Sequence, residues 1–420
     1  MNILLCLDAI NNKMKGFFNL KETQSETRPE GKLYSCTTCG LYENCISPKI
    51  EPYGGFKKGI MNIGSMPSSD DDTVGTLFQG RTGRLLKRTY SKLGIDLIED
   101  CININAVRCC PKDKAPTTKQ ITSCRRFVLQ YIKEYQPKII VIFGDEALQS
   151  IMGHRWKNDL GGISKWRGWI IPDQDFKAWV CPTLNPEYVQ QQSKTEIDSI
   201  WAKDLAKAVD ALSIPFYKDK HPTIHIIDDL QDAFNTRPYS NLISFDYETT
   251  GIKPHMKGHR IVCAAVAVSP DECYSFKMPD TKSDREPFLK WLRDPTIGKM
   301  AHNMKFEDHW TVQRLRTEIK NWTWDSMQAA HILDNRPYIT GLKFQTYVNF
   351  GIIDYASEVV PYLKSTSDAH GANGINQIQT MFQSLNLTEK LLTYCGMDAI
   401  YQYRLAMKQI EQMNYSFLPF

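Results

Sequence analysis

The chain has 420 residues, of which 42% are hydrophobic and 23% are charged, and its formal net charge is +4. This composition is typical of a globular protein with about two or three domains, and it excludes a disordered or fibrous chain. The net charge is too small to indicate a nucleic-acid partner by itself. No stretch reaches the about 18 apolar residues of a membrane span, and the apolar start lacks the basic segment of a signal peptide. We therefore expect a cytoplasmic protein without a membrane contact.

After an irregular lead-in over residues 1–32, the segment 33–212 alternates short apolar runs with stretches suited to helices. Strands are predicted at 60–64, 101–107 and 138–144. A helix from about Glu196 to Leu212 closes the segment. This alternation predicts an α/β domain with a central, mostly parallel sheet. The following residues, 213–222, contain two prolines and no periodicity, and they predict a linker between domains.

The segment 223–420 begins with strands and continues with helices. Strand candidates lie at 223–227, 242–248, 260–268 and 272–278. Helical patterns dominate after Glu286 and end in a long helix from about Leu387 to Gln412. Strands followed by helices predict a mixed sheet that is covered by helices, so we expect a second domain with a different type of sheet.

Cysteines are concentrated in the first half, where nine of the 12 precede residue 182. Disulfides are rare in the reducing cytoplasm, so this clustering indicates a metal or metal-cluster site. The best candidates are four cysteines, of which the first two form a C-x-x-C pair: Cys36, Cys39, Cys109 and Cys124. Cys45 and Cys110 are alternative ligands. The spacing alone leaves zinc, an iron–sulfur cluster and ordinary buried cysteines as open interpretations.

Six segments of residues 33–212 follow one another in the order of a known family. They are CTTCGLYENC, MNIGSMP, GTLFQGRTGRLL, INAVRCCPKDKAP, SCRRFVLQYIKEYQPKIIVIFG and PTLNPEY. In this order they resemble the iron–sulfur uracil-DNA glycosylases of families four and five. The resemblance implies a uracil-DNA-glycosylase-like domain over 33–212 with a structural [4Fe–4S] cluster. The ligands of that cluster would be Cys36, Cys39, Cys109 and Cys124.

The same resemblance implies a pocket for an extruded base. Phe78 matches the family's stacking aromatic residue, and Asn105 matches its uracil-reading amide. The chain differs from the family at two catalytic positions. Ser65 stands where the family has a carboxylate, and Asn185 stands where it has a histidine. An Asn amide cannot carry a positive charge, so we expect glycosylase activity to be lost, although mismatch-type glycosylases also have Asn-Pro here. The run Asp70–Asp72 offers carboxylates but is typical of a solvated loop.

The segment LISFDYETTG is the most informative part of the second half. On a strand, Asp246 and Glu248 project to one face, while Phe245 and Tyr247 project to the other. Two adjacent carboxylates repel each other, and divalent cations would remove that cost. The alternative interpretation is a strand with one acidic face exposed to solvent.

Two further segments add candidate residues. In AHNMKFEDHW, Asn303 is predicted as a helix N-cap, and Glu307 lies one helical turn beyond it. In YCGMDAIYQY, Tyr394 and Asp398 lie four residues apart and hence on one face of a helix. Asp325 is predicted as the N-cap of another helix. Together these motifs resemble the tyrosine-bearing branch of the DEDD exonuclease superfamily, in particular the proofreading domain of family-A DNA polymerases.

This resemblance implies a 3′–5′ exonuclease that uses two Mg²⁺ or Mn²⁺ ions. The metal ligands would be four acids: Asp246, Glu248, Glu307 and Asp398. Tyr394 would orient the attacking water, and the products would be nucleoside 5′-monophosphates. The family has Asp where this chain has Glu307, and we favour Glu307 over the adjacent Asp308, which is rotated by about 100° around the helix. Asn303 and Lys305 are candidates for substrate contacts.

The second resemblance covers about residues 223–412, so the domain order resembles the N-terminal part of a bacteriophage family-A DNA polymerase that lacks the polymerase domain. We expect an exonuclease domain over 223–420 that acts on single-stranded or frayed 3′ ends of DNA. Its role would be proofreading or end trimming in phage-type DNA replication, in the cytoplasm of the host cell if the protein is phage-encoded. A separate DNA polymerase polypeptide would carry out synthesis, and the N-terminal domain would bind DNA or a replication partner.

Two alternatives belong to other functional classes. The first is an active uracil or damaged-base DNA glycosylase that is coupled to end trimming. The second is a non-catalytic replisome adaptor, in which neither site performs chemistry.

Overall fold

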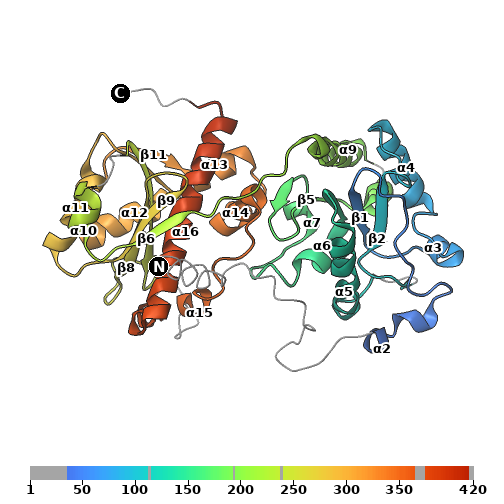
Figure 1. Ribbon diagram of the computed structural model, residues 1–420, viewed down its shortest axis with the longest axis horizontal. Helices are drawn as coiled ribbons and strands as arrows, with labels where there is room; N and C mark the ends of the chain where they lie inside the picture. The colour runs from blue at the N-terminus through green and yellow to red at the C-terminus, as the bar shows by residue number, and fades with distance from the viewer. Residues whose placement is uncertain (1–35, 112–114, 193, 237–239, 365–373, 416–420) are drawn as a thin grey trace, which may run out of the picture. The chain divides into compact units, whose positions relative to one another are not determined.

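The computed structural model describes residues 36–111, 115–192, 194–236, 240–364 and 374–415 (Figure 1). The lead-in predicted at 1–32 lies outside these residues. Contacts divide the chain into two compact units. The first consists of the described residues up to Gly153, with Asp175–Ala178 and Pro182–Leu212. The second consists of His154–Gln174, Trp179–Cys181 and the described residues from Ser213 onward.

Five strands form the first sheet, in the order β2-β1-β3-β5-β4. Their bounds are β1 (Ile60–Gly64), β2 (Cys101–Asn105), β3 (Ile139–Phe143), β4 (Ile171–Asp173) and β5 (Ala178–Thr183). Strand β1 pairs in parallel with both β2 and β3. These three strands are buried along their whole length, as expected where both faces of a parallel sheet are covered. The strands predicted here and their parallel arrangement are therefore confirmed.

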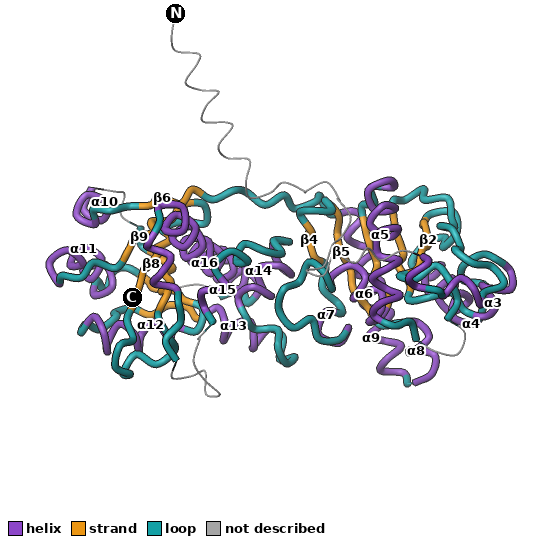
Figure 2. The backbone as a smooth tube through the Cα atoms, turned by 90° about the horizontal axis from the view of Figure 1, so that it is seen from below, coloured by secondary structure: helices purple, strands orange, loops and turns teal. Residues whose placement is uncertain are grey.

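Helices pack against this sheet. Their bounds are α2 (Cys36–Cys39), η1 (Leu41–Asn44), α3 (Ser69–Val74), α4 (Arg81–Lys92), α5 (Thr118–Tyr135), α6 (Gly144–Met152), α8 (Pro186–Gln192), α9 (Thr195–Asp210) and η2 (Ala211–Ser213). Helix α6 contacts β3 and β1, and α5 packs on α6 (Figure 2). A capping box begins α5, in which the Thr117 hydroxyl accepts from the Gln120 N–H and the Gln120 side chain accepts from the Thr117 N–H.

Six strands form the second sheet, in the order β11-β10-β7-β8-β9-β6. Their bounds are β6 (Thr223–Ile226), β7 (Leu242–Thr249), β8 (Ile261–Ala267), β9 (Glu272–Lys277), β10 (Gly298–Ala301) and β11 (Trp322–Asp325). Strands β7, β8 and β9 are antiparallel neighbours, whereas β10 runs parallel to β7 and to β11. The predicted mixed sheet is confirmed, with β11 as an additional short strand.

The second unit also contains helices. Their bounds are α7 (Ile163–Trp166), α10 (Leu230–Thr236), α11 (Lys282–Arg293), α12 (Met304–Trp310), η3 (Thr311–Leu315), α13 (Ser326–Leu333), α14 (Leu342–Phe350), α15 (Val360–Leu363), η4 (Ile378–Gln383) and α16 (Leu385–Gln412). The long helix α16 contacts β6, β7, β8, β9 and β10 (Figure 1). In the described part of the chain, none of the helices combines the length and the apolar character that crossing a membrane requires.

Strand β7 separates an apolar environment from a polar one. Phe245 and Tyr247 enter an apolar cluster that also contains Phe288. On the opposite face, the Asp246 carboxylate accepts a hydrogen bond from Gln402 of α16 (2.7 Å). The predicted alternation of side chains along β7 is therefore confirmed, and it directs acidic groups toward α16.

A buried polar network joins β1 to β2 and predicts a measurable stability effect. The Tyr90 hydroxyl donates to Asn62 Oδ1 (2.7 Å), and Asn62 Nδ2 donates to Asn103 Oδ1 (2.9 Å). In the variant Tyr90→Phe, Asn62 loses this buried donor, so we expect the free energy of unfolding in urea to fall by about 1–3 kcal/mol. Tyr188→Phe is the control, because Tyr188 is 43% exposed. An equal effect of both variants would contradict this role of the network.

Candidate functional site

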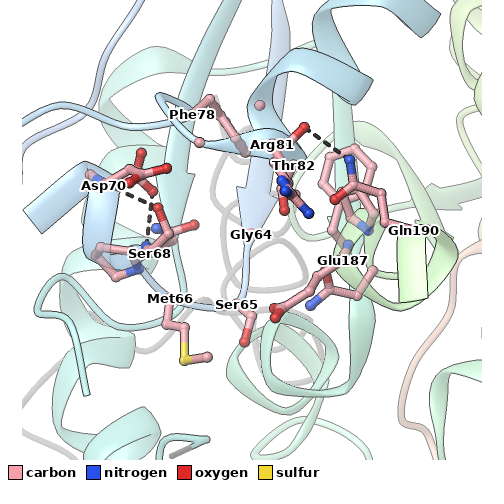
Figure 3. A pocket seen from close by; sticks show the side chains of 18 of the residues that line it. Gly64, Ser65, Met66, Ser68, Asp70, Phe78, Arg81, Thr82, Glu187 and Gln190 are labelled. Atoms are coloured by element: carbon pink, nitrogen blue, oxygen red, sulfur yellow. Dashed lines mark hydrogen bonds between the residues drawn. The ribbon is translucent and has the colours of Figure 1, made fainter. Parts of the chain in front are cut away.

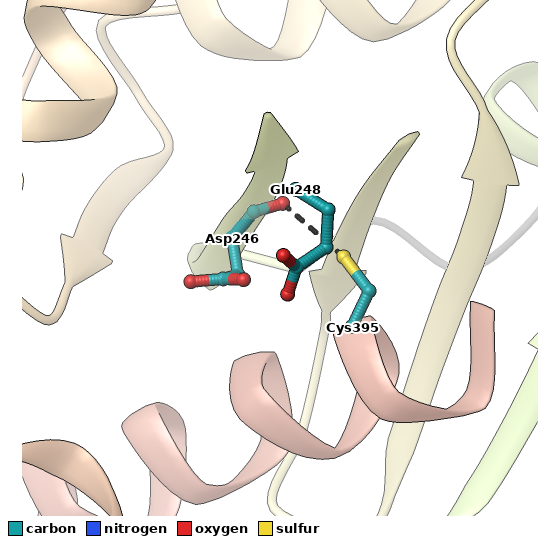
Figure 4. A group of neighbouring side chains, drawn as sticks. All are labelled: Asp246, Glu248 and Cys395. Carbon is teal, nitrogen blue, oxygen red and sulfur yellow. Dashed lines mark hydrogen bonds between the residues drawn. The ribbon is translucent and has the colours of Figure 1, made fainter. Parts of the chain in front are cut away.

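Three side chains from β7 and α16 meet in the second unit. Ligand atoms of Asp246, Glu248 and Cys395 lie within 4.8 Å of one another (Figure 4). The two carboxylates come from alternate positions of β7, and the thiol of Cys395 points to the backbone oxygen of Asp246 (3.7 Å). This is the only group of three such metal-type ligands found among the described residues.

The other predicted exonuclease residues line the same cavity. Its volume is about 460 Å³, and its lining includes Asp246, Glu248, Glu307, Tyr394 and Asp398. Glu307 lies in the first turn of α12 and is 3% exposed, and Asp398 of α16 is 6% exposed. The structure therefore brings together four carboxylates and a phenol from a strand and two helices.

Burial and mutual repulsion dominate the electrostatics of this cavity. Burial, followed by the nearby charge of Asp398, raises the pKa of Asp246 to about 8. Burial and the charge of Asp246 raise the pKa values of Glu248 and Glu307 well above the ordinary carboxyl range. In the described part of the chain, Glu307 Oε2 is buried without a hydrogen-bond partner. Cys395 is not among the lining residues, so the carboxylate donors that face the cavity are oxygens, and oxygen donors fit hard divalent cations such as Mg²⁺ or Mn²⁺.

Three partners of the carboxylates were missed by the sequence interpretation. Lys343 Nζ forms an ion pair with Asp398, and the Tyr355 hydroxyl donates to the same Asp398 oxygen (2.6 Å). Gln402 Nε2 donates to Asp246 Oδ1 (2.7 Å). Gln402 lies four residues after Asp398, so helical spacing could have identified it. Lys343 and Tyr355 lie outside the three motifs, and no sequence signal points to them.

Asn303 and Asp325 are the two predicted N-cap residues, at the starts of α12 and α13. Asn303 occupies the N-cap position with a left-handed backbone (φ 77°), but its side chain makes no capping hydrogen bond. The predicted N-cap position is therefore confirmed, but it is Asp325 that accepts from the backbone N–H groups of Asn303 (3.0 Å) and Met304 (3.1 Å). Asp325 also accepts from the N–H of Met327 at the start of α13 (2.9 Å), so its predicted N-cap role is confirmed.

Neighbours of Glu307 differ in their relation to the cavity. Asp308 turns away, and its Oδ1 accepts from the indole N–H of Trp322 (3.1 Å). Asn303 lines the cavity. Lys305 is exposed and is not among the lining residues. His302 lines the cavity and contacts Ser326 Oγ through Nδ1 (2.8 Å), and burial lowers its pKa to about 4.

A second cavity, in the first unit, gathers the predicted base-pocket residues. Its volume is about 530 Å³, and Phe78, Asn105 and Asn185 all line it (Figure 3). Asn185 Oδ1 accepts from the Glu187 N–H (2.9 Å) at the start of α8, so its amide N–H₂ is the group left for a ligand. Phe78 has a left-handed backbone (φ 63°), a conformation that bulky residues adopt only where packing imposes it.

Ser65 and the run Asp70–Asp72 lie at or near this cavity. Ser65, which stands at the position of the family's carboxylate, lines the cavity. The run Asp70–Asp72 lies in helix α3, so the predicted solvated loop is wrong. Asp71 accepts from the N–H groups of Ser68 and Gln79, and Asp72 from those of Ile46 and Ser47, because buried carboxylates need donors. Asp70 lines the cavity.

The four predicted cluster ligands surround a small space in the first unit. Its volume is about 10 Å³, and its lining includes Cys36, Cys39, Cys109 and Cys124. Burial, with smaller contributions from the neighbouring cysteines, raises the pKa of the Cys124 thiol to about 11. Cys45 and Cys110 are not among the lining residues, and the Cys45 thiol donates to the backbone oxygen of Cys110 (3.2 Å).

Comparisons with known proteins assign a family to each part of the chain. The model of the uracil DNA glycosylase superfamily matches residues 51–207, and that of a 3′–5′ exonuclease family matches residues 222–413. The type-4 uracil-DNA glycosylase of Thermotoga maritima is 30% identical over 178 residues, which are 42% of this chain and 89% of that protein. That of Saccharolobus solfataricus is 30% identical over 184 residues, 42% of this chain and 82% of that protein.

Among solved structures, Brucella melitensis NrnC resembles this chain with a TM-score of 0.32 and 16% identity, over 47% of this chain and 85% of that one. This similarity is too low to support an inference about function. The identity and coverage of the curated relatives are sufficient for a family assignment. The chain therefore belongs to the type-4 uracil-DNA glycosylase family through its N-terminal part and carries a 3′–5′ exonuclease domain in its C-terminal part.

Proposed function

We propose that this protein is a metal-dependent 3′–5′ DNA exonuclease whose active site is the cavity beside β7. The observation that carries the proposal is the convergence of four carboxylates on one cavity: Asp246, Glu248, Glu307 and Asp398. These residues would hold two divalent cations. When bound, such ions supply an activated water and neutralise the charge on the leaving 3′-oxygen.

Other side chains of the cavity would orient the reacting groups. Burial raises the pKa of Tyr394 well above its ordinary value, so its hydroxyl stays protonated and suits it to position the attacking water rather than to act as a base. Gln402 and Tyr355 hydrogen-bond to Asp246 and Asp398, and we infer that they fix the orientation of these two carboxylates. Lys343 would exchange its ion pair with Asp398 for a contact with the scissile phosphate.

The size of the cavity supports a substrate with an unpaired end. A cavity of about 460 Å³ admits an unpaired end rather than a duplex, which favours single-stranded or frayed 3′ ends and nucleoside 5′-monophosphate products. The motif resemblance to family-A proofreading domains supports a role in proofreading or end trimming during phage-type replication, beside a polymerase on a separate polypeptide. Asn303, which lines the cavity, is the better of the two predicted substrate contacts.

For the N-terminal domain we propose DNA binding with little or no glycosylase activity. The cavity lined by Phe78, Asn105 and Asn185 supports capture of an extruded base, while Ser65 supplies no charge for hydrolysis. We also propose a [4Fe–4S] cluster on Cys36, Cys39, Cys109 and Cys124. In the described chain no three of these sulfurs lie within 4.8 Å of one another, which favours a cluster of several atoms over a single tetrahedral ion.

The exonuclease proposal predicts the effect of removing one ligand. In Asp246→Asn, we expect release of nucleotides from labelled single-stranded DNA in Mg²⁺ to fall at least about 100-fold, because one charged metal ligand is lost. Asp308→Asn is the matched control, since Asp308 is adjacent to Glu307 but accepts from Trp322 and does not line the cavity. Undiminished degradation by Asp246→Asn would refute the assignment of this site.

The raised pKa values predict how metal-free stability depends on pH. Between a pKa of about 4 in the unfolded chain and about 8 in the folded one, Asp246 retains its proton only when folded. Unfolding then releases a proton, so the melting temperature in EDTA should fall as the pH rises from 5 to 8. Asp246→Asn should lessen this fall, and Mg²⁺ should raise the melting temperature most at pH 8. A pH-independent melting temperature would contradict the electrostatic description.

The glycosylase domain can be tested without interference from end degradation. In the Asp246→Asn background, we expect the chain to release uracil from single-stranded DNA about 100-fold more slowly than its Ser65→Glu derivative, because a general-base carboxylate contributes about that factor. Asp70→Asn tests one of the three carboxylates that already line the cavity, the others being Asp71 and Glu187. If the chain with Ser65 releases uracil as fast as the Ser65→Glu derivative, the proposed loss of activity is wrong.

A further inference from the structure

A segment of the glycosylase match belongs structurally to the exonuclease unit. Residues His154–Gln174 lie within the 51–207 match to the glycosylase superfamily, but their contacts group them with the second unit. Three residues of this segment line the carboxylate cavity: Trp156, Asn158 and Lys165. The cavity is therefore not built from the 222–413 exonuclease match alone.

Aromatic packing holds the segment against α14. The Trp166 ring centroid lies 4.9 Å from that of Phe344 and 5.9 Å from that of Tyr347. Trp156 packs on Trp166 at 5.2 Å and on Tyr347 at 5.9 Å. Because Trp166 is fully buried and Trp156 is 6% exposed, this packing removes large apolar areas from water and fixes the segment.

Polar contacts also fix the segment. Arg336 donates to the backbone oxygens of Ser164 (3.0 Å) and Arg167 (2.8 Å). At the end of α14, the backbone oxygen of Pro172 lies 1.7 Å from where a Cβ at Gly351 would be, so only glycine allows this approach. The segment is thus a fixed wall of the cavity, and the side chains that it presents are preorganised.

Lys165 is the charged group that this wall presents. Its Nζ lies 5.2 Å from the Phe344 ring centroid and donates to the backbone oxygen of Asp159 (3.0 Å), not to a carboxylate. The other lysine that lines the cavity, Lys343, is paired with Asp398. Burial lowers the pKa of Lys165. Because its ammonium is not paired with a carboxylate, an incoming phosphate can bind it directly.

Tyr338 lies at the same cavity and is exposed to an unusual extent. Its side chain is 85% exposed and its backbone is left-handed (φ 65°), which is unfavourable for a bulky residue. The adjacent Ile339 is fully buried, and its backbone oxygen accepts from Gln345 Nε2 (2.8 Å). The surrounding structure thus imposes a strained conformation that presents an aromatic ring to solvent, a pattern that occurs at ligand sites.

We propose that Lys165 and Tyr338 form a second nucleotide subsite of the exonuclease. Lys165 binds the phosphate on the 5′ side of the scissile one, and Tyr338 stacks on the base of the penultimate nucleotide. This inference rests on the proposed exonuclease function and specifies how that site binds single-stranded DNA. It makes substrate binding by the exonuclease depend on Lys165, a residue that lies within the glycosylase match.

Two substrates separate this subsite from the reaction centre. Trithymidylate reaches the subsite, whereas the p-nitrophenyl ester of thymidine 5′-monophosphate has one phosphate and no preceding nucleotide. In Lys165→Gln, we expect the KM for trithymidylate to rise about tenfold more than the KM for the ester. The control is Lys157→Gln, because Lys157 lies in the same segment but outside the cavity lining. Equal changes for both substrates would indicate a structural role and overturn the proposal.

A binding measurement decides the proposal independently of catalysis. In the Asp246→Asn background, fluorescence anisotropy with labelled trithymidylate should give a log–log salt slope smaller by about 0.7 for Lys165→Gln, since one phosphate contact is lost. Tyr338→Ala should weaken binding about tenfold, and Tyr338→Phe should retain it. Unchanged slope and affinity would refute the subsite. If Asp246→Asn alone still degraded DNA fully, the exonuclease site would be refuted instead, and the binding result for Lys165 and Tyr338 would remain valid.

Discussion

Repulsion among buried carboxylates is the constraint on which the second unit depends. Asp246, Glu248, Glu307 and Asp398 line one cavity, and the pKa values of the first three are raised by burial and by neighbouring charges. Such a group of carboxylates lowers the stability of the folded chain, because an unpaired buried charge is among the most destabilising features of a protein. Cations bound in the cavity would offset this repulsion. Helix α16, which carries Asp398, contacts β7 and so brings the carboxylates together.

Much of this site could be predicted because its motifs are local. Alternation along β7 and the four-residue spacing on α16 each give the direction of a side chain from sequence alone, and both were confirmed. Lys343 and Tyr355 could not be found in this way, since they reach Asp398 through tertiary packing and leave no periodic signal. The strands β1 to β3 were predictable for a related reason, because strands buried on both faces are short and mainly apolar.

Two differences between the expected and the observed structure share one cause, which is competition for backbone N–H groups. Asn303 was expected to cap α12, but Asp325, a carboxylate brought there by β11, accepts from that backbone instead. The run Asp70–Asp72 was expected in solvent, but two of its carboxylates satisfy N–H groups of other segments. A charged acceptor binds N–H groups more strongly than an amide or water does, and its partners are distant in sequence. Such pairings are visible only after the chain has folded.

The segment His154–Gln174 shows why sequence families and structural units need not share boundaries. A family match records descent along the chain, whereas contacts record where apolar area is buried. Here Trp156 and Trp166 bury their rings against Phe344 and Tyr347, and this packing assigns the segment to the exonuclease unit. Lys165, a residue inherited within a base-binding domain, can then serve a phosphodiesterase site beside Tyr338 of the exonuclease match, because a fixed cation and a solvent-facing aromatic ring suit any single-stranded nucleic acid. The two domains would thus have to be retained together, even if the pocket around Ser65 has lost its chemistry.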